Sequence, residues 1–293
     1  MKSALKLFAI YKKEMRTYFT GMMGYVFLAF LLLLMGIWFS MLNVFSRDAN
    51  FHFVLNNVTI FFFILIPTLT MRLFSEEARQ KTDQLLFTSP VTIAGIVIGK
   101  FMAAFTLFLL GVVITIILPL LIRSYAELPV SQIVGAYIGF VLLGASCIAV
   151  GVFISVLTEN QIIAAVGTMA AIFVMFLMDM IAASMPASTF ASLMFVIFII
   201  VIFASIWYNS TRNIITTIIV GILSVAIAGG FYLFNDMAFD GLIVRVLLWL
   251  SIFSRFDSFF NGILNLSDII YYLSFSVLFV YLTINVIEKR RWR

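Results

Sequence analysis

The sequence predicts an all-α polytopic membrane protein with about eight transmembrane helices. Of the 293 residues, 64% are hydrophobic and 11% are charged, and the mean hydropathy is +1.18. A soluble domain has about 45–50% apolar and about 25% charged residues. The core of a soluble protein of 293 residues could not bury this much apolar surface. The apolar residues form runs of about 20, which also excludes a membrane β-barrel because its strands alternate apolar and polar residues.

Eight runs are long enough to cross the bilayer, since about 20 apolar residues cross ~30 Å of hydrocarbon. We predict spans at residues 22–42, 56–74, 96–122, 132–157, 161–183, 190–208, 213–234 and 268–287. Only a short polar turn at 209–212 separates the sixth span from the seventh. We do not expect a cleavable signal peptide, because no small-residue cleavage site follows the first apolar run.

The distribution of lysine and arginine predicts the orientation, because cytoplasmic loops are enriched in both. Eight spans place both termini on one side, and the basic residues divide fourteen to four in favour of that side. We therefore expect a multi-pass protein of the cell membrane with both termini in the cytoplasm. The four basic residues expected outside are Arg47, Arg123, Arg245 and Arg255.

Residues 1–20 predict an amphipathic helix on the inner membrane surface. Apolar residues such as Leu5, Phe8 and Phe19 alternate with basic residues at helical spacing. Attraction to anionic lipid contributes about 1 kcal/mol per basic residue. The residues expected to anchor this helix are Lys6, Lys12, Lys13 and Arg16.

The loop at residues 75–95 is the most informative inner segment. Ser75 can cap a helix, and Glu76 and Glu77 favour the positive N-terminal end of that helix. Residues 88–90, Thr-Ser-Pro, can stop it, and residues 85–87 give it an apolar tip. We expect a cytosolic helix on which a soluble partner can push, and a solvated loop is the alternative.

The segment at residues 235–267 is the longest expected outer loop. Apolar residues recur every three or four positions, with Asp, Arg, Ser and Asn between them. This pattern favours interfacial or re-entrant helices before the last span. The alternative is a short ninth span at residues 242–253, which Arg245 and Arg255 flank or interrupt.

The sequence lacks the residues that most catalytic or metal sites need. His52 is the single histidine and Cys147 the single cysteine, so neither a multi-histidine metal site nor an internal disulfide is expected. The glycines before Lys100 do not have phosphate-loop spacing. Ionisable residues near the spans, such as Arg72 and Asp179, lie at span ends, which disfavours a proton relay.

Small residues recur in the fourth span, and small residues let helices approach closely. They are either an internal packing surface, which we favour, or the seam of a dimer. They comprise Gly135, Gly139, Gly144, Ala145, Ala149 and Gly151.

Four features together resemble the ABC-2 family of ABC-transporter membrane subunits, in particular the gliding-motility-type permeases. The first is the basic amphipathic start that leads into residues 18–27, and the most specific is residues 70–91, TMRLFSEEARQKTDQLLFTSPV. The last is the basic tail at residues 288–291. The third feature, before and at the start of the last span, comprises Phe256, Phe259, Phe260, Gly262, Asp268 and Tyr271.

This resemblance implies a permease subunit, with export favoured, that is not itself an enzyme. It implies two cytosolic ATPase subunits that bind ATP and Mg, a second permease chain that is identical or related, and often an accessory membrane subunit with an external domain. No cofactor in this chain and no nucleic acid partner are expected. It assigns Phe256, Phe259, Phe260 and Gly262 to outer re-entrant helices. It places the ATPase-coupling helix in the inner loop, at Glu76, Glu77, Arg79, Lys81, Asp83, Leu85, Leu86 and Phe87.

The chain departs from the usual six-span core of that family through an added helix pair at residues 184–234. The resulting division is an interfacial helix at 1–20, spans one to five at 21–183, the added pair, outer helices at 235–267, and the last span with its tail at 268–293. Two other functions stay open: a non-transporting membrane scaffold that docks partners, and a secondary carrier driven by an ion gradient.

Overall fold

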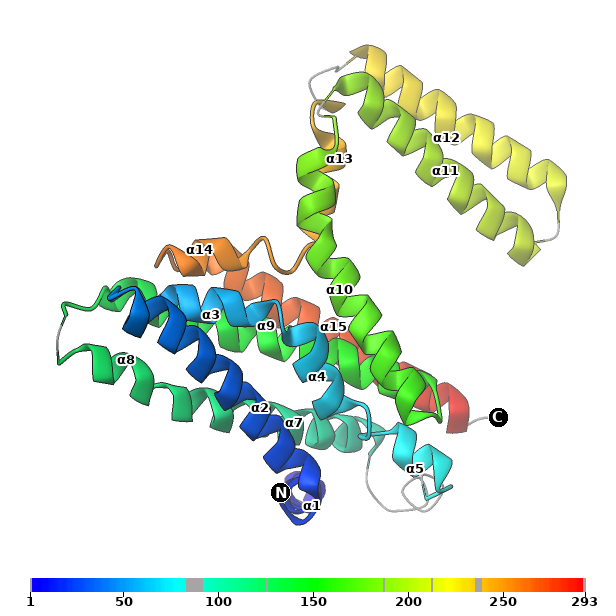
Figure 1. Cartoon of the computed structure of the whole chain (residues 1–293). Helices are drawn as coiled ribbons and strands as arrows, with labels where there is room; N and C mark the ends of the chain where they lie inside the picture. The colour runs from blue at the N-terminus through cyan, green and yellow to red at the C-terminus, as the bar shows by residue number, and fades with distance from the viewer. Residues whose placement is uncertain are drawn as a thin grey trace. The chain divides into compact units, whose positions relative to one another are not determined.

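A computed structural model describes residues 2–82, 92–124, 126–186, 188–211, 213–234 and 239–291. Within these ranges the regular structure is helical and contains no strand (Figure 1). The chain divides into two compact units. Unit 1 comprises Met1–Val174 and Arg255–Arg293, and unit 2 comprises Met175–Ser254.

Unit 1 holds most of the long helices. The first part of the chain supplies α1 (Lys2–Thr20), α2 (Met22–Phe39), the π-helix η1 (Ser40–Phe45), α3 (His52–Thr59), α4 (Phe62–Thr70) and α5 (Ser75–Arg79). The remainder is α7 (Ile93–Thr115), α8 (Ile117–Ile122), α9 (Val130–Leu157), the start of α10 (Gln161–Ser184), α14 (Phe256–Phe260) and α15 (Leu266–Arg291). Unit 2 holds the end of α10 with α11 (Thr189–Thr211), α12 (Ile214–Phe234) and α13 (Leu242–Leu250).

Five helices in the described ranges are long and apolar enough to cross a membrane. They are Met22–Phe45, Ile93–Ile122, Val130–Leu157, Gln161–Ser184 and Leu266–Arg290. These correspond to the first, third, fourth, fifth and last of the predicted spans, and they indicate a multi-pass membrane protein. The predicted number of eight is not confirmed, because the apolar stretches found in α11 and α12, Thr189–Ser205 and Ile214–Ala226, are shorter than a span.

The second predicted span is not one straight helix. The run expected at residues 56–74 starts earlier, at His52, and is broken between α3 and α4, which bend by 66°. It counts as a sixth candidate span or as a re-entrant segment. Pro67 lies inside α4 and lacks an N–H, but the break precedes it by more than a turn, so Pro67 does not explain the bend.

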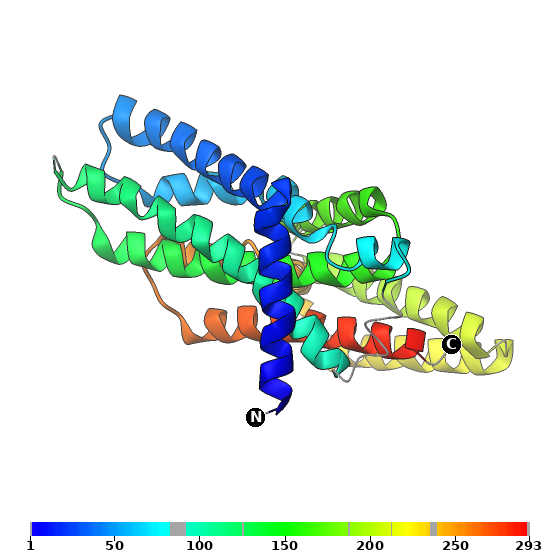
Figure 2. The same cartoon turned by 90° about the horizontal axis from the view of Figure 1, so that it is seen from below.

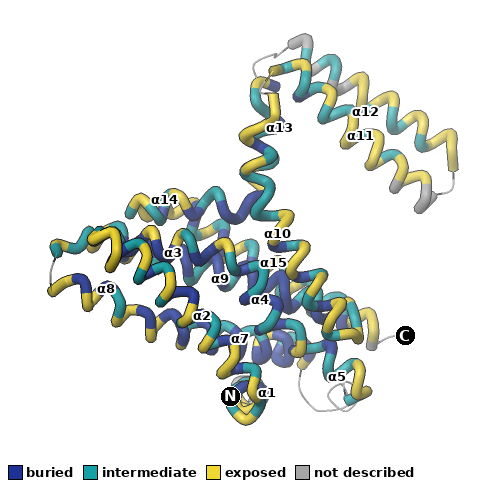
Figure 3. Tube along the Cα trace, viewed as in Figure 1, coloured by how far each residue is buried: buried dark blue, intermediate teal, exposed yellow. Residues whose placement is uncertain are grey.

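The core of unit 1 surrounds α9, the most buried of the candidate spans (Figure 3). Helices α4, α7, α14 and α15 all contact it. A methyl group added to Gly144 would lie 2.4 Å from the Phe108 ring, and one added to Gly151 would lie 2.3 Å from Oγ1 of Thr70. These glycines of the fourth span therefore serve packing within the chain, as favoured from the sequence.

The α14 end of unit 1 is packed on the same helix. Phe256 and Phe259 are buried, and a methyl group on Gly139 would meet the Phe259 side chain at 2.6 Å. Gly262 has a φ of +76°, a conformation that glycine adopts without strain. This turn brings the Gly262 backbone against Gly135 of α9.

Helix α13 of unit 2 lies in the segment where outer helices were expected before the last span, and it is short. Helix α13 has nine residues, or about 13 Å of helix, so the alternative of a ninth span at 242–253 is wrong. The segment after α13 packs on the second half of α10, where the Phe176 and Phe253 rings meet edge to face at 5.4 Å. Helices α11 and α12 lie side by side and expose much of their apolar surface.

The beginning and the end of the chain lie at one end of unit 1. Ile10 of α1 packs against Gly99 near the start of α7, and Figure 2 shows α1 crossing α7. Ile287 of α15 joins Ile93 and Val97 of α7 in one apolar cluster. We call this the α1 end of unit 1.

Candidate functional site

One face of helix α1 packs against the protein interior, and this face includes a carboxylate. Ile10, Glu14 and Tyr18 are spaced by four residues and therefore share one face of the helix. All three are buried, whereas Phe8 is 59% exposed. The face that packs on the protein is thus different from the apolar face expected at Leu5, Phe8 and Phe19.

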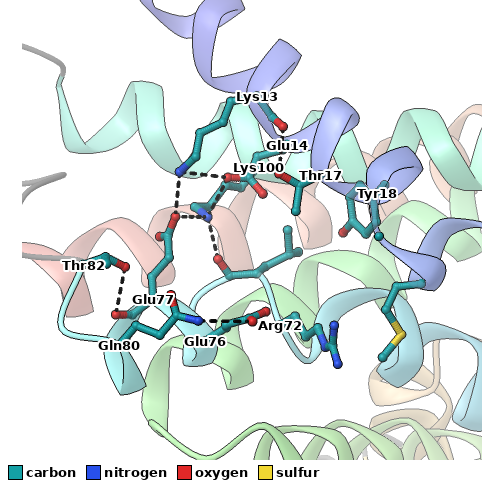
Figure 4. Close-up of a pocket in the computed structure, with 13 residues that line it drawn as sticks. Lys13, Glu14, Thr17, Tyr18, Arg72, Glu76, Glu77, Gln80, Thr82 and Lys100 are labelled. Carbon is teal, nitrogen blue, oxygen red and sulfur yellow. Dashed lines mark hydrogen bonds and ion pairs between the residues drawn. The ribbon is translucent and has the colours of Figure 1, made fainter.

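Lys100 of α7 lies opposite this face of α1 and is fully enclosed. Its side chain is 1% exposed, and its Nζ lies 3.0 Å from Oε1 of Glu14 and 3.0 Å from Oε1 of Glu77. The same Nζ donates to the carbonyl of Leu73 at 2.6 Å. The ammonium thus donates hydrogen bonds to Glu14 and to the Leu73 carbonyl, and it forms an ion pair with Glu77 (Figure 4). The Phe74 ring lies 5.0 Å from Nζ and adds a cation–π contact.

Lys13 completes a four-residue ionic cluster, defined here as Lys13, Glu14, Glu77 and Lys100. Its Nζ lies 3.2 Å from Oε1 of Glu77 and 3.9 Å from Oε1 of Glu14. Two ammonium groups therefore balance two carboxylates. Lys13 is 58% exposed, and the two carboxylates are 10% and 16% exposed. Because solvent screens exposed pairs, Lys100 is the cation on which the buried carboxylates depend.

The ionic cluster joins three elements that are distant in sequence. Glu14 and Lys13 lie on α1, Glu77 lies on α5, and Lys100 lies on α7. Helix α5 follows the broken span and precedes α7. The short helix between two apolar helices is therefore attached to the next one by charge.

Ser155 of α9 fixes the start of α5 from a second direction. Its Oγ accepts hydrogen bonds from the backbone N–H groups of Phe74 at 3.1 Å and Ser75 at 3.3 Å. Both N–H groups belong to the first residues of a helix, which have no intrahelical acceptor. A side chain 80 residues away in sequence thus supplies the cap.

Two expectations about this helix are wrong. Ser75 does not cap it, because Phe74 holds the N-cap position and the Ser75 hydroxyl donates to the Met71 carbonyl. The helix also does not run to residues 88–90, because α5 ends at Arg79 and Lys81 has a φ of +56°. This left-handed residue lets the Thr82 N–H bond back to the Glu77 carbonyl at 3.0 Å, which terminates a helix.

The predicted coupling residues differ in their exposure, and four of them lie outside the described residues. Glu76 is partly buried and Glu77 joins the ionic cluster, while Arg79 and Lys81 are exposed. The two glutamates do occupy the first turn of α5, as expected. Four predicted residues lie outside the described ranges: Asp83, Leu85, Leu86 and Phe87.

The expected anchoring and outer residues are placed as follows. Lys12 and Arg16 are exposed on α1, Lys13 is in the ionic cluster, and the Lys6 side chain is outside the description. At the opposite end of unit 1, Phe260 packs edge to face on His52 and Phe53.

Arg255 and Asp268 form an ion pair outside the ionic cluster, at 2.9 Å. It connects the residue before α14 to the first turn of α15. The Arg255 guanidinium also stacks 4.0 Å from the Tyr271 ring centroid. These contacts hold Phe256 and Phe259 against α9.

Tyr18 ties α1 to the end of α4. Its buried hydroxyl donates to the Leu69 carbonyl at 2.9 Å. Burial, and secondly the charge of Glu14, raise the pKa of this hydroxyl well above its ordinary value, so it stays a neutral donor. The hydroxyl is one of several contacts that position α1 on the bundle.

Replacing Tyr18 with Phe removes this hydrogen bond while keeping the ring. We expect Tyr18→Phe to lower the free energy of unfolding by about 0.5–1.5 kcal/mol, the net value of such a bond. Tyr25→Phe is the matched control because Tyr25 is 58% exposed. Thermal unfolding in detergent checks both, and equal midpoints for the two variants would contradict the bond.

A cavity of about 400 Å³ adjoins the ionic cluster (Figure 4). Its other polar lining comes mainly from Thr17, Tyr18, Arg72, Glu76 and Gln80. Within the described residues, no group of three His, Cys, Asp or Glu side chains is arranged to hold a metal ion.

Glu14, Tyr18, Lys100 and Ser155 were not among the predicted site residues. The position of Lys100 in an apolar run could have identified it as a site residue, because a lysine within an apolar helix requires an anionic partner. Ser155 gave none, since a serine in a span is ordinarily a packing residue.

No protein-family model matches the chain, and no curated protein or solved structure matches it.

Proposed function

We propose that this chain is the membrane-spanning permease subunit of an ABC-2 type transporter, with export as the direction. In this proposal two separate cytosolic ATPase subunits bind ATP and Mg, and a second permease chain completes the pathway. The chain itself catalyses no reaction. The proposal rests on the resemblance of residues 70–91 to such permeases, together with the way in which α5 is attached to its neighbours.

The attachment of α5 is the structural observation that supports the proposal most. A partner that displaces a free loop moves nothing else. Helix α5 instead shares Glu77 with Lys100 of α7, and its first N–H groups bond to Ser155 of α9. A push on α5 is therefore transmitted to two candidate spans, which is the property that a coupling helix needs.

In this proposal the α1 end of unit 1 faces the cytoplasm of the cell. Exposed basic residues gather there on α1, on and after α5, and at the end of α15, whereas Arg47 and Arg123 lie at other helix ends. Cytoplasmic segments are enriched in such residues. Helices α11 and α12 would be two further spans, which gives eight with the broken one.

The mechanism follows from the arrangement of charges. ATP-driven closure of the ATPase subunits would shift α5 through two exposed residues, Arg79 at its end and Lys81 just after it. Because Glu77 is held by a buried ammonium, α7 and α1 would move with α5. The spans would then change their packing around α9 and let the substrate leave the membrane.

Two groups of variants test the proposal in a pulldown with the ATPase subunit. Arg79→Ala, on the exposed side of α5, should reduce ATPase binding several-fold, since hot-spot contacts of interfaces are enriched in arginine. Glu77→Gln should leave binding largely intact and should instead weaken the stimulation of ATP turnover by the permease. Arg123→Ala, an exposed arginine at the C-cap of α8, is the control for loss of a positive charge.

Unchanged binding with Arg79→Ala and unchanged turnover with Glu77→Gln would contradict the coupling role. A scaffold predicts partner binding without coupled ATP hydrolysis. A secondary carrier predicts transport that depends on an ion gradient and needs no ATPase.

A further inference from the structure

The cavity beside the ionic cluster lies where two apolar helices end. Its wall includes Gly21 and Met23 at the start of α2, and Arg72, two residues after the end of α4. The rest comes from the amphipathic helix α1, from α5 and from Lys100. In a bilayer, the headgroup layer begins where apolar spans end. The cavity therefore opens at the depth of phospholipid headgroups.

Arg72 is the cation of this wall that is available to a ligand. Lys13 and Lys100 are both engaged by Glu14 and Glu77. Arg72 is exposed and forms no ion pair within 4.0 Å with any residue of the described ranges. A guanidinium can donate two parallel hydrogen bonds to a phosphate.

The acceptors of the wall are also identifiable. Glu76 receives one side-chain hydrogen bond within the described part of the chain, a 3.4 Å contact from the Gln80 amide. The Thr17 hydroxyl donates to the Lys13 carbonyl, and the Tyr18 hydroxyl donates to Leu69. The oxygens of these hydroxyls are therefore left as acceptors. A ligand here needs donors of its own as well as an anionic group.

The overall charge favours a zwitterion. The described wall carries three cations and three carboxylates, which cancel; they are Lys13, Arg72, Lys100, Glu14, Glu76 and Glu77. A site for a simple anion would carry an excess of positive charge. We propose that the cavity binds the headgroup of an amine-bearing phospholipid, with its phosphate on Arg72 and its primary ammonium on Glu76.

The site should discriminate between phospholipids by the chemistry of their amine. A primary ammonium has N–H donors for the Glu76 carboxylate, whereas the quaternary ammonium of phosphatidylcholine has none. The bound lipid would bridge α1–α2 and α4–α5. The proposal depends on membrane insertion of the chain and does not depend on the ATPase partner.

Native mass spectrometry of the full purified chain tests the site. The probes are phosphatidylethanolamine and phosphatidylcholine with identical acyl chains, each offered at the same concentration in detergent. Phosphatidylethanolamine should be retained preferentially, and soluble glycerophosphoethanolamine or inorganic phosphate should compete only weakly because neither has acyl chains. If either soluble compound competes as well as the lipid, the site is one for free phosphates and the lipid assignment is overturned.

Two variants separate the two contacts. Arg72→Gln should lower retention of phosphatidylethanolamine about tenfold, as expected for a lost charge-assisted hydrogen bond. Glu76→Gln should abolish the preference over phosphatidylcholine while it leaves phosphate-dependent retention in place. Arg290→Gln is the matched control, because Arg290 is exposed at the same end of unit 1 and does not line the cavity.

The outcomes are decisive even if Arg72→Gln does not fold, because Glu76→Gln tests the ammonium contact by itself. Equal retention of both lipids by the unmodified chain would overturn the proposal. An undiminished preference in Glu76→Gln would do the same. An equal loss in Arg290→Gln would show that general attraction to basic residues, and not the cavity, holds the lipid.

Discussion

Replacing Lys100 with Met is expected to destabilise the protein severely. The substitution keeps the volume of the side chain but leaves Glu14 and Glu77 without their buried cation, and the Leu73 carbonyl loses its donor. Removal of one partner from a buried ion pair costs about 3–5 kcal/mol. We therefore expect a large fall in the midpoint of thermal unfolding in detergent, together with loss of protease protection at α5.

The same substitution at Lys13 is the matched control. Lys13 contacts the same two carboxylates but is 58% exposed, so Lys13→Met should cost at most about 1 kcal/mol. The triple variant Lys100→Met, Glu14→Gln, Glu77→Gln should recover much of the stability, because it removes the uncompensated charges. If Lys100→Met were no worse than Lys13→Met, the buried ionic cluster would not exist as described.

Adding one methyl group at Gly135 is expected to have the second largest effect. An alanine Cβ there would lie 2.6 Å from the Phe259 carbonyl oxygen and 3.0 Å from Cα of Gly262. Both are backbone atoms, so no side-chain rotation relieves the overlap, and α14 must shift away from α9. Overpacking of this kind costs about 1–3 kcal/mol, which the thermal unfolding midpoint measures.

Gly36 in α2 provides a control of opposite sign. A methyl group there meets no atom within 4 Å, and alanine is favoured over glycine inside a helix by about 0.5–1 kcal/mol. Gly36→Ala should therefore be neutral or stabilising while Gly135→Ala is destabilising. Equal midpoints would mean that α14 does not rest on α9.

The candidate spans were largely predictable because hydropathy alone determines them. The predicted runs at 96–122, 132–157 and 161–183 match α7 with α8, α9 and α10 to within a few residues. The bend between α3 and α4 was not predictable in this way. Ile60 and Phe61 at the break are as apolar as their neighbours, and a hydropathy pattern carries no information about backbone direction.

The candidate site was only partly predictable. Glu77 was identified as part of the inner loop, but its partners were not, because Glu14 and Lys100 are 86 residues apart in sequence. The spacing of Ile10, Glu14 and Tyr18 on one helical face was the available signal. It was obscured by the more evident apolar residues at Phe8 and Phe19, since an interfacial helix has both a lipid face and a protein face.

The length of α5 shows a further limit of local patterns. Acidic residues in its first turn were correctly expected from their interaction with the helix dipole. Its cap comes from Ser155 and its end from the left-handed Lys81. Tertiary contacts and a strained backbone residue, and not the nearby Ser75 or Pro90, therefore set the start and the end of the helix.

ATP hydrolysis that co-purifies with the full chain tests the central claim most directly. We predict that the chain, tagged and extracted from its native membrane, brings with it an ATP-hydrolysing subunit whose turnover falls when Glu77 is replaced by Gln. A chain that carries no such subunit, yet moves solute into sealed vesicles when only an ion gradient is imposed, would contradict it.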